Sequence, residues 1–543
     1  MSSFDLLATG AAREAVSAHV EQLVADRVAS RLFDHDATLW GPDAESEASI
    51  RLGWVDLFAA SRELVDPVVA LRDELRSEGV TRVVLAGMGG SSLAPEVITA
   101  TAGVELVVLD STDPEMVSAA LADRLEESVL VVSSKSGSTV ETDSQRRVFE
   151  GAFTRAGLDA ASRIVVVTDP GSPMDESARA AGYRAVFNAD PNVGGRYSAL
   201  TAFGLVPSGL AGVDIAALLD EAEEAAEFLR EDDPDNAGLV LGAALGGTRP
   251  LRDKIVFVDE GSGIVGFADW AEQLIAESTG KNGTGLLPVV VEPGAPELSS
   301  GAQDVLVVRL GSPDADVETG ADAGTDAPEV RVAGSLGSQL IVWEVATVVA
   351  GRLLGINPFD QPDVEAAKKA ARGLLDERPE PAPADLVDGG VELRGTAGLL
   401  DGVEDLPGAL RRLLADLPAD GYLSVQAYLD RVGIPDLSRV RGELAAAAGR
   451  PVTFGWGPRF LHSTGQFHKG GPAVGVFLQV TAASERDLEI PDRPFSFGQL
   501  IEAQAAGDAA VLAEQGRPVL RLHLADRTTA LQQLRDAVAS LSA

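Results

Sequence analysis

The chain has 543 residues, 45% of them apolar, and its 44 basic and 83 acidic side chains give a formal net charge of −39. This length predicts two or three domains, and the charge argues against nucleic acid as a partner. The sequence has no cysteine, which excludes disulfides and thiolate chemistry, and its five histidines show no metal-ligand spacing, so we expect no metal and no other cofactor. It shows neither a signal peptide nor an apolar run of membrane-spanning length, so we expect a cytoplasmic protein with no membrane partner.

Residues 1–80 are expected to form an N-terminal helical segment, because apolar positions recur at helical spacing, for example at Val20, Leu23, Val24 and Val28. Beyond this segment, short apolar runs alternate with helical stretches, which predicts a doubly wound parallel sheet over residues 81–235. The expected strands are Val83–Ala86, Leu106–Leu109, Val129–Val132, Ile164–Val167 and a short one at Ala185–Phe187. Ligands of such sheets bind beyond the carboxyl ends of the strands, where the loops Gly87–Ser92 and Ser133–Thr139 fall.

The loop Ser133–Thr139 combines hydroxyl side chains with a lysine and leads into a polar helix. Ser138 and Glu141 have the spacing of a capping box, so the plain interpretation is that the hydroxyls only cap the helix. One cap needs one hydroxyl, however, and a lysine adds nothing to it. The free N–H groups of a helix start attract anions. We therefore expect a phosphate site formed by Ser134, Lys135, Ser136 and Thr139.

The loop Gly87–Ser92 reads G-M-G-G-S-S and permits a dinucleotide site as a minority interpretation. Asp110 closes the next strand at about the distance that such a site needs. Ser92, however, stands where the dinucleotide fingerprint has its third glycine. A dinucleotide site also leaves the hydroxyl-rich loop without a role.

A second alternating section, residues 236–375, predicts another α/β sandwich with an acidic, glycine-rich surface loop at Gly311–Glu329. Its expected strands are Ile255–Val258, Leu287–Val291, Val305–Leu310 and Val330–Val332, and its expected helices include Ile264–Glu277 and Leu336–Leu354. Residues 376–390 are rich in proline and acids and predict a linker. Residues 391–543 predict a C-terminal α/β lobe, with strands at Ala473–Val480 and Val519–Leu524.

Six ordered motifs of this chain resemble the phosphoglucose isomerase family. They are G-M-G-G-S at 87–91, S-K-S-G-S-T-V-E-T at 134–142, G-G-R-Y-S at 194–198, W-A-E-Q-L-I-A-E-S-T-G-K at 270–281, N-P-F-D-Q-P-D-V-E-A-A-K at 357–368 and H-S-T-G-Q at 462–466. The chain is most similar to the isomerase half of bacterial proteins that fuse a transaldolase to a phosphoglucose isomerase, and no transaldolase half is visible. The resemblance implies two sugar-isomerase (SIS) domains and a cofactor-free enzyme that interconverts glucose 6-phosphate and fructose 6-phosphate through a cis-enediol.

The sequence departs from the family pattern at two positions. Asp363 stands where the family usually has glycine, and His462 follows the Phe-Asp-Gln motif instead of preceding it. Either the histidine motif has moved into an added C-terminal lobe, or this lobe is a partial copy of the second domain. The family works as a homodimer in which each site takes its histidine from the partner. Here we expect His462 to reach its own chain's site, although the linker would also allow a neighbour's.

The resemblance assigns a role to each motif residue. Glu277 is expected to move the proton between C2 and C1, with Gln273 on the same helix face. Arg196 is expected to offset the charge of the enediolate, and Lys368 and His462 are expected to open the sugar ring. Each of these residues also has a plain interpretation. Glu277 would be an ordinary acid at a helix end, and Arg196 would form a salt bridge within its loop. Lys368 would be a solvated lysine, and His462 would be a structural histidine.

Three further residues complete the expected substrate site. Gly90 and Ser91 are expected to contact the sugar or its phosphate from the neighbouring loop. Gln361 is expected two helical turns before Lys368, on the same helix face. Two alternatives to the isomerase remain open: a sugar-phosphate sensor that keeps the phosphate site without chemistry, and a dual isomerase that also accepts mannose 6-phosphate. A sensor needs only the phosphate site, so the presence of Glu277, Arg196 and Lys368 together favours an enzyme.

Overall fold

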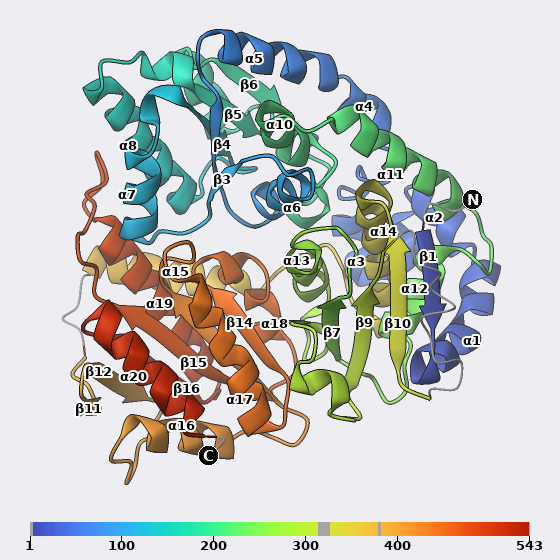
Figure 1. The fold of residues 1–543 in the computed structure, drawn as a ribbon. Coiled ribbons are helices and arrows are strands. Elements are labelled where there is room, and N and C mark those ends of the chain that lie inside the picture. The colour runs from blue at the N-terminus through green and yellow to red at the C-terminus, as the bar shows by residue number, and fades with distance from the viewer. Residues whose placement is uncertain (1–3, 313–325, 378–381, 542–543) are drawn as a thin grey trace.

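The structure, a computed structural model, describes residues 4–312, 326–377 and 382–541. Three sheets, each flanked by helices, surround a central junction where α6 (Leu93–Thr101), α13 (Phe267–Thr279) and α18 (Gly465–Gly470) meet (Figure 1). Most of the surface loop expected at Gly311–Glu329, and part of the predicted linker, lie outside the described residues. The prediction of an α/β protein built on doubly wound parallel sheets is confirmed.

The first sheet has the order β3-β2-β4-β5-β6 and is parallel throughout. Its strands are β2 (Arg82–Gly87), β3 (Val107–Leu109), β4 (Ser128–Ser133), β5 (Ile164–Thr168) and β6 (Ala185–Asn188), as predicted to within two residues. Helices α5 (Val65–Ser77), α6 (Leu93–Thr101) and α10 (Ala202–Ala211) pack on one face, and α7 (Pro114–Ala122), α8 (Val140–Arg155) and α9 (Pro173–Ala181) on the other. Because both faces are covered, these strands are continuous apolar runs.

The second sheet has the order β1-β10-β9-β7-β8. Its parallel strands are β7 (Lys254–Asp259), β8 (Leu287–Val291), β9 (Val305–Leu310) and β10 (Glu329–Gly334), and its helices include α11 (Ile215–Leu229), α12 (Ala237–Gly246), α13 (Phe267–Thr279) and α14 (Leu336–Leu354). The expectation that residues 1–80 are helical is wrong at its start, because β1 (Phe4–Ala8) pairs antiparallel with β10. A five-residue strand has too short a pattern to distinguish from a helix in sequence, and here it covers an otherwise open sheet edge.

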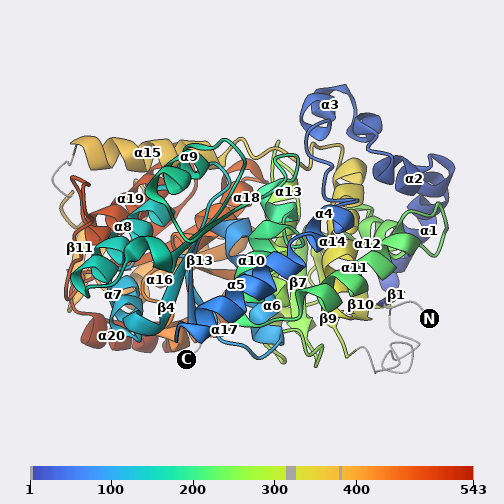
Figure 2. The ribbon, with the colours of Figure 1, turned by 90° about the horizontal axis from the view of Figure 1, so that it is seen from above.

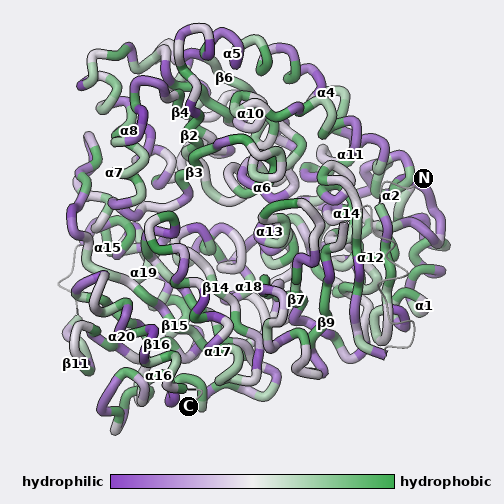
Figure 3. Tube along the Cα trace, viewed as in Figure 1, coloured by the Kyte–Doolittle hydropathy of each residue, from purple (hydrophilic) through white to green (hydrophobic). Residues whose placement is uncertain are grey.

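The rest of the N-terminal segment is mainly helical, and its helices α1–α3 lie at one end of the molecule (Figure 2). Its helices are α1 (Gly10–Ala25), α2 (Val28–Phe33), α3 (Pro42–Ala48) and α4 (Phe58–Arg62). The buried strands are coloured mainly as hydrophobic in Figure 3, whereas outer helices such as α5 and α11 mix both kinds of residue. This pattern fits helices that bury one stripe and expose the other.

Helix α14 corrects the expectation that no apolar run reaches membrane-spanning length. It has 19 residues and is apolar enough to cross a membrane by length and composition alone. It is nevertheless buried inside the protein against α11 and α12, and 89% of its most apolar window is covered. A core helix of a large protein is apolar all round for the same physical reason as a membrane helix.

The C-terminal lobe is built on a third sheet, of order β11-β12-β16-β15-β13-β14. Its strands are β11 (Leu386–Asp388), β12 (Val391–Gly395), β13 (Tyr422–Tyr428), β14 (Val452–Trp456), β15 (Gly475–Ala482) and β16 (Val519–Leu524). Sequence analysis found β15 and β16 but missed the inner strand β13, which is wholly buried although Ser424 and Gln426 interrupt its apolar pattern. The helices of the lobe are α16 (Leu406–Ala415), α17 (Val440–Ala448), α18 (Gly465–Gly470), α19 (Phe497–Glu514) and α20 (Arg527–Ala539).

Part of the predicted linker at 376–390 is regular secondary structure. Helix α15 (Val364–Glu377) continues into it, and β11 lies near its other end. Although α15 was expected to belong to the second domain, it packs along α19 of the C-terminal lobe (Figure 2).

The C-terminal lobe also shares hydrophobic cores with both other sheets. Phe497 and Leu500 of α19 pack on the face of the first sheet that α7, α8 and α9 also cover. Phe467 of α18 packs with Val256 and Val289 of the second sheet. Exposing such surface costs about 25 cal/mol per Å². The lobe is therefore held on the body of its own chain by apolar packing.

Candidate active site

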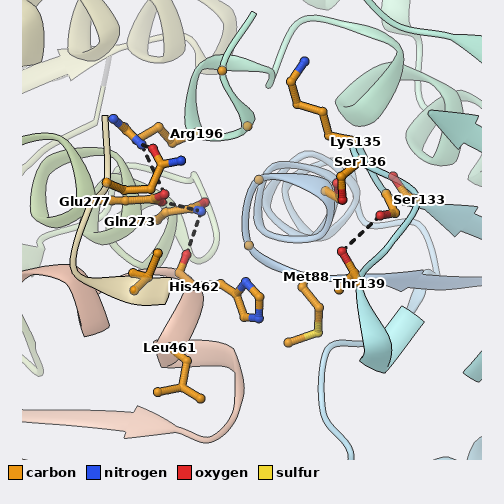
Figure 4. A pocket seen from close by; sticks show the side chains of 18 of the residues that line it. Met88, Ser133, Lys135, Ser136, Thr139, Arg196, Gln273, Glu277, Leu461 and His462 are labelled. Carbon is orange, nitrogen blue, oxygen red and sulfur yellow. Dashed lines mark hydrogen bonds and ion pairs between the residues drawn. The ribbon is translucent and has the colours of Figure 1, made fainter. Parts of the chain in front are cut away.

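The junction of the three sheets contains a cleft of about 430 Å³. All twelve residues that the sequence assigned to a site line it: Gly90, Ser91, Ser134, Lys135, Ser136, Thr139, Arg196, Gln273, Glu277, Gln361, Lys368 and His462. Figure 4 shows Arg196, Glu277 and Gln273 on one side of the cleft, the hydroxyl-bearing loop on the other, and His462 between them. The residues come from all three sheet regions, so the cleft exists only when the lobe is in place.

The hydroxyl-bearing loop does not form the expected capping box. Helix α8 begins at Val140, and its N-cap residue Thr139 makes no side-chain cap bond. The hydroxyls pair across the loop instead: Ser134 with Thr139 at 3.0 Å and Ser136 with Ser138 at 2.9 Å. Glu141, the expected partner of the box, turns toward the C-terminal lobe. The loop thus has several hydroxyls that are not used to cap the helix.

Two cationic side chains meet at the same end of the cleft. Lys135 and Arg51 both donate to the carbonyl of Pro191, at 3.2 and 3.3 Å. Each also has an acidic partner, Asp169 for Lys135 at 2.8 Å and Glu47 for Arg51 at 2.7 Å. Sequence analysis missed Arg51, because it lies in the N-terminal segment, outside every motif. Both cations line the cleft, so each is shared between a carboxylate, the carbonyl of Pro191 and the cleft.

A close backbone contact joins the glycine loop to the arginine loop. A Cβ at Gly90 would lie 1.9 Å from the carbonyl oxygen of Gly195, so only glycine fits there. Gly89 has φ +56°, and a Cβ there would meet both Gln273 and His462. These two glycines let the loop, α13 and the C-terminal lobe converge on the cleft.

The carboxylate of Glu277 lies in the cleft on α13 and is held by two neighbours. Gln273, one turn earlier, donates from Nε2 to Glu277 Oε2 at 3.1 Å, as its spacing predicted. Arg196 Nη1 lies 3.1 Å from Glu277 Oε1. The side chain of Glu277 keeps 15% of its surface exposed, so the carboxylate is oriented without being sealed from a ligand.

The guanidinium of Arg196 is buried and fully engaged. It donates to Ser278 Oγ at 2.8 Å, to Gln361 Oε1 at 2.9 Å and to the carbonyl of Pro358 at 2.8 Å. Arg196 is therefore a fixed positive charge rather than a free hydrogen-bond donor. Sequence analysis did not foresee Ser278, which positions this guanidinium from α13.

Gln361 does not lie on a helix with Lys368, contrary to the prediction. Helix α15 begins at Val364, and Gln361 belongs to the preceding loop. The buried ammonium of Lys281 holds this loop by donating to the carbonyls of Asn357 and Asp360, and burial lowers the pKa of Lys281 to about 8. The loop, not helical spacing, brings Gln361 into the cleft.

Lys368 reaches the cleft from α15 and retains 39% side-chain exposure. Its ammonium lies 2.9 Å from Glu365, one turn earlier on the same helix. A pair this exposed contributes little to stability. Lys368 is thus available to a ligand, although the geometry alone is also that of an ordinary surface lysine.

His462 forms a pair with Glu141 that sequence analysis missed. The imidazole Nε2 lies 3.4 Å from Glu141 Oε1, and the backbone carbonyl of His462 accepts from Gln273 at 2.7 Å. Burial alone would raise the pKa of Glu141, but the bond and charge of His462, with the charge of Lys368, hold this pKa below its usual range. A carboxylate that contacts one ring nitrogen orients an imidazole for proton transfer. The two residues are 321 positions apart, so only the fold reveals this pair.

The structure also explains the aspartate that replaces the family's glycine. Asp363 Oδ2 accepts from Gln466 Nε2 at 2.6 Å, and its backbone N–H donates to Gln466 Oε1 at 3.0 Å. Gln466 donates as well to the carbonyl of Gly280 at the end of α13. Asp363 therefore ties the start of α15 to the H-S-T-G-Q motif, and the two departures from the family pattern contact each other.

Comparisons with known proteins agree with these motifs. The sequence pattern of the family described as Phosphoglucose isomerase matches residues 69–256. A probable glucose-6-phosphate isomerase of Natronomonas pharaonis is 32% identical over 409 residues, which are 67% of this chain and 93% of that protein. A glucose-6-phosphate isomerase of Rubrobacter xylanophilus is 30% identical over 374 residues, covering 57% and 86% of the two chains.

Solved structures show the same fold over part of the chain. A hypothetical protein of Thermus thermophilus has a TM-score of 0.54 and 25% identity, covering 68% of this chain and all of that one. A glucose-6-phosphate isomerase of Chlamydia trachomatis has a TM-score of 0.50 and 22% identity, covering 62% and 75%. About a third of this chain thus lies outside either superposition. Within the described residues, no group of three histidine or acidic side chains could hold a metal ion.

Proposed function

The chain belongs to the phosphoglucose isomerase family, and we propose that its central cleft interconverts glucose 6-phosphate and fructose 6-phosphate with Glu277 as the general base. One observation carries the assignment of the site: a carboxylate, a fixed guanidinium, a carboxylate-paired imidazole and a hydroxyl-rich loop with two cations line the same cleft. A sensor that only binds would need the loop alone. The family match ends at residue 256, so the roles of Glu277, Lys368 and His462 rest on motif and geometry.

The first step is ring opening. The ring oxygen must gain a proton while the C1 hydroxyl loses one. His462, oriented by Glu141, and Lys368 are the groups in the cleft that can exchange these protons. An imidazole titrates near neutral pH and can carry a proton in either direction.

The second step moves a proton between C2 and C1. Glu277 removes the C2 proton, which gives a cis-enediol(ate), and returns it to C1 on the same face. Negative charge develops on the oxygen atoms during this transfer. The Arg196 guanidinium stabilises that charge across the cleft without reorganising, because its hydrogen bonds already fix its position. Gln273 and Gln361 keep the base and the guanidinium aligned.

The phosphate is proposed to bind at the hydroxyl-rich loop, with Lys135 and Arg51 as its cations and Gly90 and Ser91 beside it. Changing both Ser136 and Thr139 to alanine should raise KM several-fold and leave kcat within about twofold. These hydroxyls would contact the phosphate equally before and during the reaction, so they provide uniform binding. Steady-state kinetics with glucose 6-phosphate measures both constants. An unchanged KM in a correctly folded variant would remove these hydroxyls from the substrate site.

A coupled assay tests the function itself. Purified protein should convert fructose 6-phosphate to glucose 6-phosphate, detected through glucose-6-phosphate dehydrogenase. Parallel assays with mannose 6-phosphate measure whether the cleft also accepts the C2 epimer. Binding without turnover of any of the three sugar phosphates would identify a sensor instead of an enzyme.

Four further proposals follow from the sequence. The chain is the counterpart of the isomerase half of bacterial transaldolase–isomerase fusions. It acts in the cytoplasm, and it can form a homodimer without lending His462 to its partner. The division at residues 81–235, 236–375 and 391–543 is retained as a proposal, with β1 added to the second unit and α15 to the lobe.

A further inference from the structure

Glu141, the partner of His462, has a second hydrogen-bond partner in the C-terminal lobe. Gln504, on α19 of the C-terminal lobe, donates from Nε2 to Glu141 Oε1 at 2.7 Å. This is the same oxygen that faces His462 Nε2. Gln504 is 4% exposed and does not line the cleft. It therefore contacts the carboxylate of Glu141 from the protein interior and not from the cleft.

The orientation of the Gln504 amide is fixed from the other side. Thr112, in the loop after β3, donates its hydroxyl proton to Gln504 Oε1 at 2.7 Å. An ionised carboxylate accepts only, so the amide nitrogen must face Glu141, and the amide oxygen must face a donor. Thr112 is fully buried. The hydroxyl therefore opposes a flip of the amide, which would turn an oxygen toward the carboxylate.

We propose that Gln504 is a positioning residue for ring opening, which holds Glu141 and through it the imidazole of His462. The inference rests on the proposed role of His462 in the isomerase. Thr112, Gln504, Glu141 and His462 form a hydrogen-bonded series that begins in the first sheet region, enters the lobe and returns to the cleft.

The contacts of Glu141 show why a second partner is needed. Its carboxylate is 5% exposed, so water cannot replace a missing hydrogen bond easily. The 3.4 Å separation between Glu141 and His462 is long for a hydrogen bond. A short, strong bond from Gln504 keeps Oε1 in place while the imidazole gains and loses its proton.

The same bond also couples the lobe to the chemistry. Helix α19 packs against α15, which carries Lys368, and its residue Gln504 holds Glu141 of α8. The two proposed ring-opening groups, Lys368 and His462, thus both depend on where α19 sits. Ring opening would therefore depend on the position of the lobe, whereas proton transfer at C2 would depend on Glu277 of α13.

The test separates ring opening from proton transfer. In a Glu277→Gln background, isomerisation is blocked, but ring opening and closing still exchange the α and β anomers of glucose 6-phosphate. Two-dimensional exchange NMR measures this rate above the spontaneous one. Adding Gln504→Met, which is unbranched and of similar length but cannot donate, should lower the catalysed exchange about tenfold, the loss expected when a charged group loses one hydrogen bond.

Two further variants make the result specific. Thr112→Val should give a smaller loss in the same direction, because it only frees the amide to flip. Gln145→Leu is the matched control: Gln145 is also buried, lies one turn after Glu141 on α8, and donates to the carbonyl of Ser111 instead. It should leave anomer exchange unchanged. In the otherwise native enzyme, Gln504→Met should lower kcat and leave KM within about twofold, since Gln504 does not touch the substrate.

Three results would be decisive against the proposals. Unchanged anomer exchange in Gln504→Met would overturn the role of Gln504. Equal losses in Gln504→Met and Gln145→Leu would show that the interface needs buried amides only for its stability. If Gln504→Met unfolds at the assay temperature, Thr112→Val decides the same question. If the Glu277→Gln protein itself does not accelerate exchange, the proposed ring opening by His462 fails instead.

Discussion

Replacing Glu277 with glutamine should lower kcat by about 10²–10⁴-fold and leave the affinity for glucose 6-phosphate nearly unchanged. The amide has almost the shape of the carboxylate but cannot accept the C2 proton. It can still accept from Arg196, although its NH₂ group would then face the Nε2 donor of Gln273, which is a mild cost. Because the phosphate is proposed to bind at the other end of the cleft, binding should survive this change.

Steady-state kinetics measures the loss in kcat. Titration calorimetry with the inactive variant gives the dissociation constant, and incorporation of deuterium at C2 reports proton abstraction directly. Asp269→Asn serves as the control, because Asp269 lies in the first turn of the same helix and does not line the cleft. If Glu277→Gln kept turnover within a few-fold of the original enzyme, another group would have to be the base.

The parts of the fold that sequence predicted are those in which local pattern and burial agree. The inner strands of the first two sheets, such as β2, β4 and β7, are buried on both faces, so they appear as continuous apolar runs with boundaries that can be read directly. Strand β13 is equally buried, but its polar residues interrupt the apolar run, and two of them, Tyr422 and Ser424, bond to His468 of α18. That environment is set by tertiary packing, so no local pattern could reveal the strand.

The same distinction applies to the site. The motifs indicated twelve residues that all line one cleft, because each motif had its own local signature. They gave no information on contacts between motifs. Glu141 had the spacing of a capping box, yet its carboxylate bonds to Gln504 in the lobe. Asp363 looked like an unexplained substitution until its bonds to Gln466 were visible. Contacts over such sequence separations depend on the topology of the fold.

His462→Ala should lower kcat for glucose 6-phosphate at least a hundredfold, the usual effect of losing a group that transfers protons. Mixing this inactive variant with inactive Glu277→Gln protein should restore no activity. The reason is that the lobe bearing His462 is bound to the body of its own chain. Arg459, three residues before His462, lies 2.6 Å from Asp110 of the first sheet region, and the backbone of His462 accepts from Gln273.

The mixing experiment distinguishes this arrangement from a site shared between subunits. To lend His462 to a partner, the lobe would have to leave the apolar surfaces that α18 and α19 cover, and the ion pair between Arg459 and the buried Asp110, and remake these contacts on the neighbouring subunit. If sites were nevertheless built across a dimer, random re-association would give one intact site in half of the dimers, and about a quarter of the original activity would return. Recovery to that level, after co-refolding of equal amounts, would show that His462 acts in the neighbouring subunit; its absence, with both variants folded, is the expected result.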